Sequence, residues 1–115
     1  MLKILFLVLL TLTLNANTFS IASYNVENFF DLNNDNDEYS EFIPNTKSNW
    51  NQNTFNIKVN NLVKVLSDVD ADIIALQEVE NRELMQNLLK KLPNYHYFSF
   101  IKYPDSAIGV KKKKK

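Results

Sequence analysis

The spacing of apolar and polar residues predicts two helices. One apolar set recurs at three- and four-residue intervals: Phe55, Val59, Leu62, Val63 and Leu66. This period is typical of an amphipathic helix, here over about residues 54–67, with Lys58 and Lys64 on its solvent side. A second helix is predicted over residues 82–92, with Asn81 as its N-cap and Pro93 as its stop.

Shorter apolar or alternating runs predict strands. They lie at residues 19–24, 73–76, 95–101 and 107–110. The run at 73–76 is apolar throughout, as in strands buried on both faces. Residues 31–53 are polar and aperiodic, which predicts a long loop. The order strand, helix, strand, helix, strand, strand indicates an α/β sheet with helices packed on it.

The first 16 residues have the features of a secretory signal. Lys3 precedes an apolar run over 4–14, and Ala16 offers a small residue for cleavage. The run is too short to cross a bilayer, which takes about 20 residues. We therefore expect a signal peptide at 1–16, a domain over 17–115, and an exported product, periplasmic or secreted, without a stable membrane span. A buried helix or an uncleaved anchor are the alternatives.

Composition and charge exclude several kinds of site. The sequence has no Cys and a single Gly, Gly109, so disulfides, thiolate metal sites and glycine-rich phosphate loops are excluded. Residues 17–110 hold seven basic and 13 acidic residues, a net charge of −6. This acidity argues against broad electrostatic binding of nucleic acid, but it does not exclude a nucleic-acid enzyme that holds divalent cations. The five lysines at 111–115 are interpreted as a basic tail, a solvated charge run or the product of a frameshift or premature stop.

Polar residues follow two of the predicted strands. Asn25 comes after the first strand, and Glu78 follows the apolar run at 73–76. If the strands are parallel neighbours, both side chains emerge at their carboxyl ends, where ligands of α/β sheets bind. Carboxylate and amide oxygens suit Mg²⁺. The alternative is structural: Glu78 caps the next helix or pairs with Arg82.

The two segments around these residues also resemble a known family. Residues 21–28 (IASYNVEN) and 71–79 (ADIIALQEV) are similar to the first two motifs of the endonuclease/exonuclease/phosphatase superfamily, the fold of pancreatic-type deoxyribonuclease. The resemblance implies a four-layer α/β sandwich and Mg²⁺- or Mn²⁺-dependent hydrolysis of a phosphate ester. It implies that Glu78 ligates the metal, and that Asn25 orients the metal, its water or a phosphate oxygen, which makes both candidate catalytic and metal-binding residues.

The sequence departs from that family in three respects. Some members carry a basic residue where this chain has Glu80, and Arg82 is the nearest substitute as a weak candidate substrate-binding residue. The later Asp/Asn motif and the Asp–His pair, which activate water in the family, have no counterpart here. The only histidine, His96, lies in the alternating run at 95–101, where a structural role is favoured. We therefore expect the N-terminal portion of an incomplete sandwich, inactive as written.

Two further patterns in the sequence favour structural roles. Asp31, Asn33 and Asp35 have the alternate spacing of a calcium loop, but the required Gly and bidentate Glu are absent, which favours a solvated loop. Trp50 and the aromatics near 95–100 suit base stacking, but such spacing is more typical of a core. For a full-length form we expect a phosphodiesterase acting on nucleic acid. A phosphomonoesterase, or a small exported binding module with a basic tail, are the alternatives.

Overall fold

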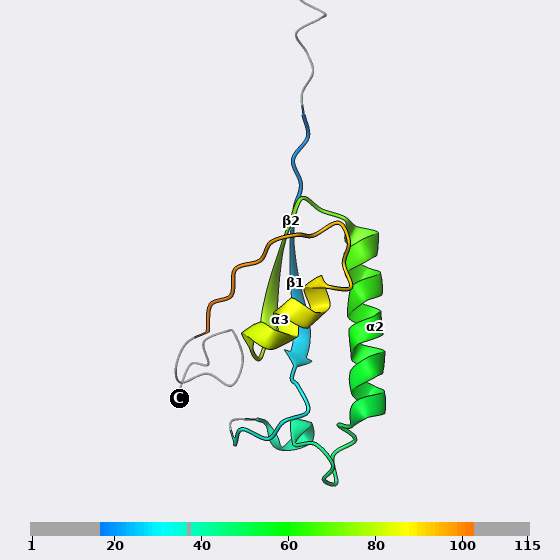
Figure 1. The fold of residues 1–115 in the computed structure, drawn as a ribbon, viewed down its shortest axis with the longest axis vertical. Coiled ribbons are helices and arrows are strands. Elements are labelled where there is room, and N and C mark those ends of the chain that lie inside the picture. The colour runs from blue at the N-terminus through cyan, green and yellow to red at the C-terminus, as the bar shows by residue number, and fades with distance from the viewer. Residues whose placement is uncertain (1–16, 37, 103–115) are drawn as a thin grey trace, which may run out of the picture.

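The structure, a computed structural model, describes residues 17–36 and 38–102 and shows a small α/β arrangement (Figure 1). Its elements in chain order are strand β1 (Ile21–Phe29), the 3₁₀ turn η1 (Ser40–Phe42), helix α2 (Gln52–Val69), strand β2 (Ile73–Val79) and helix α3 (Arg82–Leu89). The α/β class is confirmed. Within the described ranges the fold is two α-helices on one two-stranded sheet, so the four-layer sandwich remains a prediction.

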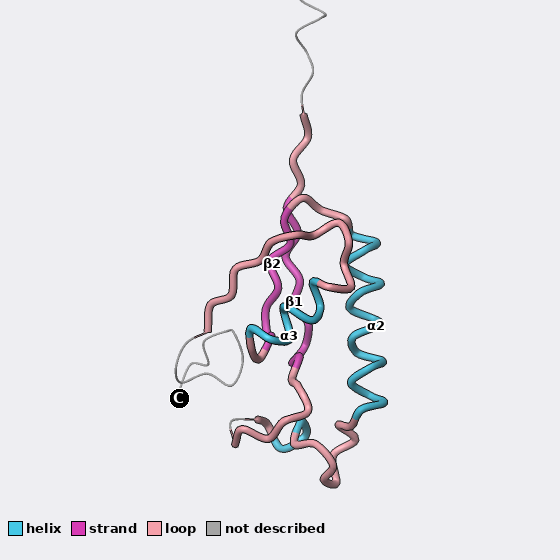
Figure 2. Tube along the Cα trace, viewed as in Figure 1, coloured by secondary structure: helices cyan, strands magenta, loops and turns pink. Residues whose placement is uncertain are grey.

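The sheet pairs β1 and β2 in parallel. The register runs from Ile21 opposite Ile73 to Asn25 opposite Gln77, and it resumes at Phe29 opposite Val79. Helix α2 makes the crossover between the strands, and α3 returns across them (Figure 2). Parallel neighbouring strands are the condition on which the predicted strand-end site depends, and this condition is met.

The core lies between the sheet and the two helices. Its buried residues are Val26, Phe29, Val59, Leu62, Leu66, Val79, Leu84, Leu88 and Leu92, with Tyr24, Ile74 and Leu76 packed against them. Strand alternation puts their neighbours Ile21 and Ile73 on the other side, where both are at least half exposed. The helices therefore cover one face of the sheet.

Helix α2 is fixed at both ends by its own sequence. The side chain of Asn51 accepts hydrogen bonds from the backbone N–H groups of Asn53 and Thr54, and the Thr54 hydroxyl accepts from Asn51 N–H, which forms a capping box. At the other end Asp70 takes a left-handed conformation and donates its N–H to Leu66 O. Asn81 caps α3 by accepting from Leu84 N–H, as predicted.

Several boundaries differ from the sequence prediction. Strand β1 covers Ile21–Phe29 rather than 19–24, and β2 continues to Val79 rather than ending at 76. Helix α2 covers Gln52–Val69 rather than 54–67, and α3 ends at Leu89 rather than 92. Residues 95–101, predicted as a strand, are extended without strand pairing in the described part of the chain, and Tyr97 is 94% exposed. A strand needs a hydrogen-bonded neighbour, and alternation in sequence does not supply one.

The predicted loop at 31–53 also carries a small core of its own. Phe30 and Trp50 are buried, with Leu32, Tyr39, Phe42 and Phe55 packed around them. The Trp50 indole N–H donates to Asp31 O at 2.8 Å. Trp50 is therefore a core residue, as favoured above.

The predictions for residues 1–16, 103–110 and 111–115 fall outside the described residues. Among the helices of the part that is described, none combines the length and apolar character needed to cross a membrane.

Candidate active site

The carboxyl ends of β1 and β2 share an irregular backbone. Between Asn25 and Phe29 the ladder is interrupted, and three residues there have positive φ: Glu27 (54°), Asn28 (60°) and Glu78 (67°). Left-handed geometry costs about 1–2 kcal/mol per residue that is not glycine. Bulges of this kind redirect side chains and are frequent beside active sites.

Asn25 and Glu78 are in direct contact at this irregularity. Asn25 Nδ2 donates to Glu78 Oε1 at 2.9 Å, and Asn28 N–H donates to Glu78 Oε2 at 3.1 Å. Both carboxylate oxygens of Glu78 are thus held in place by the opposite strand. The two residues singled out from sequence are brought together, and the alternative partner of Glu78, Arg82, is not the one it uses.

Three side chains form hydrogen bonds with the backbone of the irregular segment of β1 at Glu27 and Asn28. Asn25 Oδ1 accepts from Glu27 N–H at 2.8 Å, and Glu78 accepts from Asn28 N–H. From α2, the Lys58 ammonium donates to Glu27 O at 3.0 Å. Lys58 was predicted on the solvent side of its helix, but it is partly buried. Lys64 is exposed, as predicted, and forms an ion pair with Asp68. The pKa of Lys58 is lowered from its ordinary value because burial disfavours the charged ammonium. The nearby carboxylates of Glu27 and Glu78 act in the opposite direction and offset part of this effect.

The carboxylate oxygens of Glu78 suit part of the coordination shell of Mg²⁺. A carboxylate oxygen that accepts one hydrogen bond keeps a further lone pair, so Glu78 retains the capacity to ligate. Mg²⁺ needs few protein ligands because it keeps several waters. Asn25 instead turns its Nδ2 to Glu78 and its Oδ1 to Glu27 N–H. In this geometry its amide orients the carboxylate.

Glu80 forms a second acidic environment that the sequence analysis did not find. Its side chain is 3% exposed and accepts from Asp31 N–H at 2.7 Å. Burial is the main cause that raises its pKa from 4.5 to about 7, with Asp31 and Glu38 adding to the effect. Carboxylate oxygens of Asp35, Glu38 and Glu80 lie within 4.8 Å of one another. The acidic residues of loop 31–38 were the available signal, although the calcium-loop pattern pointed to different partners.

The remaining candidates, Arg82 and His96, form no hydrogen bond or ion pair with Asn25 or Glu78 in the described part of the chain. The Arg82 guanidinium is 5.3 Å from the centre of the Phe98 ring, and among the described residues it has no hydrogen bond or ion pair with the site. His96 is exposed in the extended segment 95–101, with its ring centre 6.4 Å from that of Tyr97. Neither its predicted strand nor an acidic partner is present in the described ranges.

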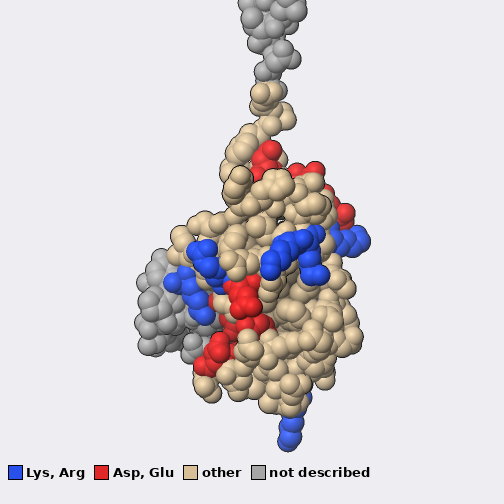
Figure 3. Space-filling view, in the orientation of Figure 1, with Lys and Arg blue, Asp and Glu red and all other residues tan. Residues whose placement is uncertain are grey.

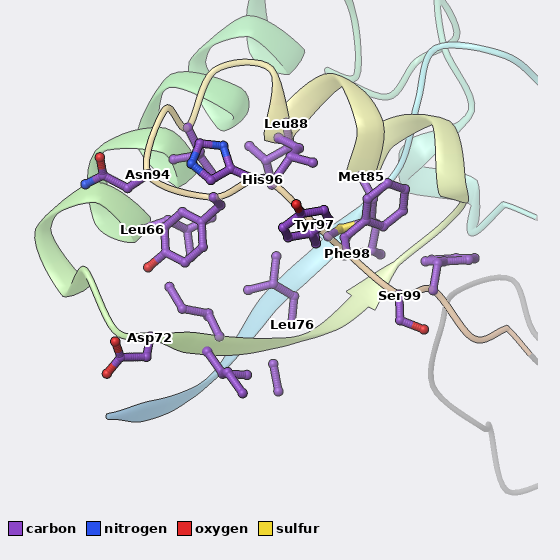
Figure 4. Close-up of a pocket in the computed structure, with 18 of the residues that line it drawn as sticks. Leu66, Asp72, Leu76, Met85, Leu88, Asn94, His96, Tyr97, Phe98 and Ser99 are labelled. Carbon is purple, nitrogen blue, oxygen red and sulfur yellow. The ribbon is translucent and has the colours of Figure 1, made fainter. Parts of the chain in front are cut away.

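A cavity in the described part of the molecule is separate from this pair. It measures about 700 Å³ and lies between β2, α3 and the segment 94–101. Leu76 of β2, Met85 and Leu88 of α3, and Tyr97 and Phe98 of the following segment are among the residues that line it (Figure 4). Its lining is mostly apolar and includes neither Asn25 nor Glu78, so it does not belong to the strand-end site.

Charged side chains are unevenly distributed over the surface. On the face seen in Figure 3, acidic side chains gather in the centre and basic side chains flank them on both sides. This arrangement agrees with the acidic balance of residues 17–110 and shows no continuous basic track on that face.

The fold and the site define a class of protein. A parallel α/β sheet with a hydrogen-bonded carboxylate at the carboxyl ends of its strands is typical of α/β proteins that bind ligands or metals at that edge. A sequence model of the endonuclease/exonuclease/phosphatase family matches residues 20–109, and the chain belongs to this family. The family consists of metal-dependent phosphoesterases. No curated protein and no solved structure matches the chain significantly.

Proposed function

We propose that the strand ends of β1 and β2 form the metal-binding part of a Mg²⁺- or Mn²⁺-dependent phosphodiesterase. Glu78 is the metal ligand, and Asn25 orients its carboxylate. The observation that carries the proposal is the pair of hydrogen bonds from Asn25 Nδ2 and Asn28 N–H to the two oxygens of Glu78.

A bound divalent ion would polarise a phosphoryl oxygen and stabilise the leaving oxyanion. The chain's own contribution is to hold the ligand still. Asn25 and Asn28 fix both oxygens of Glu78, so little side-chain freedom remains to be lost when an ion binds. The backbone strain at Glu27, Asn28 and Glu78 is retained because these hydrogen bonds compensate for it.

Metal binding to the full chain tests this proposal. Calorimetric titration with Mn²⁺ is expected to show a site that Glu78→Gln weakens at least tenfold, because an amide oxygen carries no charge to offset the cation. Glu83→Gln is the matched control, since it removes the same charge from an exposed position on α3. Equal affinity in Glu78→Gln and wild type would contradict the assignment.

Nucleic-acid phosphodiesters are the proposed substrate class, with phosphomonoesters of lipids or sugars as the second candidate. The support is membership in a family of phosphoesterases that includes endonucleases. The residues described here include no histidine beside Glu78, so we expect the chain as written to cleave DNA no faster than Glu78→Ala in Mg²⁺. Metal-dependent cleavage that Glu78→Ala abolishes would overturn that expectation and identify the substrate.

Export is proposed on the features of residues 1–16: a positive charge, a short apolar run and a small residue. Expression in a bacterial host followed by N-terminal sequencing of the periplasmic product tests it. A product that stays in the cytoplasm with Met1 or Leu2 at its N-terminus would contradict it.

A further inference from the structure

A lysine on α2 reaches the strained turn beside Glu78. Lys58 Nζ donates to Glu27 O at 3.0 Å, across 31 positions of sequence, and this is a hydrogen bond between a helix and the end of β1. The Glu27 carbonyl and the Asn28 N–H belong to the same peptide unit, and this N–H donates to Glu78 Oε2. Lys58 and Glu78 therefore hold the two polar groups of one peptide unit, its C=O and its N–H.

The geometry of that peptide is costly without such support. Glu27 and Asn28 both have positive φ, and neither is a glycine. Asn25 Oδ1 satisfies Glu27 N–H, and Glu78 satisfies Asn28 N–H, so Lys58 supplies the hydrogen bond to the intervening carbonyl. A charged donor forms a stronger hydrogen bond than a neutral one.

We propose that Lys58 is a positioning residue for Glu78: it fixes the Glu27–Asn28 peptide so that Asn28 N–H remains bonded to the Glu78 carboxylate. The effect of Lys58 on metal binding rests on the function proposed above, whereas its effect on the Glu27–Asn28 peptide does not. The position of Lys58 on α2 also couples the crossover helix to the strand-end site.

Helix α2 provides the matched control for this role. Lys64 lies on the same helix, is exposed, and forms its ion pair among the described residues with Asp68 on its own helix, at 3.1 Å. Lys58→Met removes the ammonium and retains an aliphatic side chain of similar length, whereas Lys58→Arg retains a cationic donor. Lys64→Met removes the same charge from the helix without touching Glu27.

The first measurement is amide hydrogen exchange of Asn28 without metal, followed by NMR. We expect Lys58→Met to speed exchange at Asn28 at least tenfold, while Lys58→Arg and Lys64→Met stay within about twofold of wild type. The amides of Leu62 and Leu66 in the core report whether each variant is folded. Unchanged exchange at Asn28 in a folded Lys58→Met variant would overturn the proposal. Exchange at Asn28 in Lys58→Arg as fast as in Lys58→Met would overturn it as well.

The second measurement is Mn²⁺ affinity in about 1 M salt, where the Debye length of about 3 Å screens simple repulsion between Lys58 and the ion. Positioning predicts three- to tenfold weaker binding in Lys58→Met and near wild-type binding in Lys58→Arg. Tighter binding in Lys58→Met would mean that Lys58 merely repels the ion, and would overturn the proposal. If the wild type binds no Mn²⁺, the function proposed above fails, and the Asn28 exchange still decides the role of Lys58.

Discussion

Glu78 and Glu80 are two residues apart at the end of β2, yet their carboxyl groups have opposite surroundings. Glu78 is partly exposed and held by donors on the opposite strand. Glu80 is almost fully buried, and acidic neighbours Asp31 and Glu38 add to the cost of ionising it. Glu78 is thus partly accessible and fixed by hydrogen bonds, whereas burial raises the pKa of Glu80 to about 7.

The raised pKa of Glu80 predicts a pH-dependent stability. Between its ordinary pKa of 4.5 and about 7 the folded state binds a proton at Glu80 that the unfolded state does not. The free energy of unfolding is therefore expected to fall as pH rises from about 4.5 through 7, by on the order of 2 kcal/mol. Urea unfolding at a series of pH values measures this slope.

Glu80→Gln should remove most of that slope, because glutamine does not titrate and its carbonyl still accepts from Asp31 N–H. Glu83→Gln, on exposed α3, should leave it unchanged. A slope that persists in Glu80→Gln would assign the pH dependence to another group.

The candidate site shows which residues sequence can reveal. Asn25 and Glu78 each follow a β-prone run, so this pair could be proposed from the pattern, although both strands continue beyond the ends that the pattern predicts. Lys58 could not be assigned to the site, since helical periodicity gives its direction around α2 and not how far its side chain reaches toward Glu27. The burial of Glu80 depends on the path of loop 31–38, which has no periodicity to read.

At the scale of the element, the N-cap of α2 sets where that helix begins and so where Lys58 lies. Asn51→Ala removes the acceptor for the N–H groups of Asn53 and Thr54. We expect a loss of about 1 kcal/mol in the free energy of unfolding. Asn51→Asp keeps the acceptor and should lose little.

Thermal or urea unfolding measures this loss, with Asn53→Ala as the control on the exposed side of the same turn. Alanine favours a helix more than asparagine does, so this control should be neutral or slightly stabilising. An Asn51→Ala variant as stable as wild type would show that tertiary packing alone fixes the start of α2.

The helices were predictable because their signals are local. Apolar spacing and the predicted cap Asn81 lie within one or two turns of the positions they define. The cap Asn51 was not predicted, and α2 begins at Gln52 rather than 54. The strand at 95–101 was wrongly predicted because alternation is only one of its two requirements. The alternation is visible in the sequence, but the neighbouring strand that must pair with it is not. The extension of β1 to Phe29 was missed for a related reason, since the left-handed residues Glu27 and Asn28 interrupt the alternation.

At the scale of the whole molecule, the buried apolar side chains of the described residues lie mainly between the helices and the sheet, and few lie beyond α3. The buried cluster joins β1, α2, β2 and α3. The segment after α3 is anchored mainly at its start, where Tyr95 OH donates to Ala71 O at 2.8 Å and Asn94 Nδ2 donates to Asp70 Oδ1 at 3.0 Å. Stability is therefore expected to be uneven along the chain.

Native-state hydrogen exchange of the full chain tests this distribution. The slowest amides should be those of α2 around Leu62 and Leu66 and of the paired part of β2, because both are hydrogen-bonded and lie against the core. Amides of 96–101 should exchange at least a hundredfold faster, since the segment has no backbone pairing in the described ranges. Protection at alternate residues of 96–101 would instead show an edge-strand ladder, in which alternate N–H groups point to a paired neighbour. That result would restore the strand that the alternation of 95–101 predicts, and it would mean that the sheet extends beyond β1 and β2.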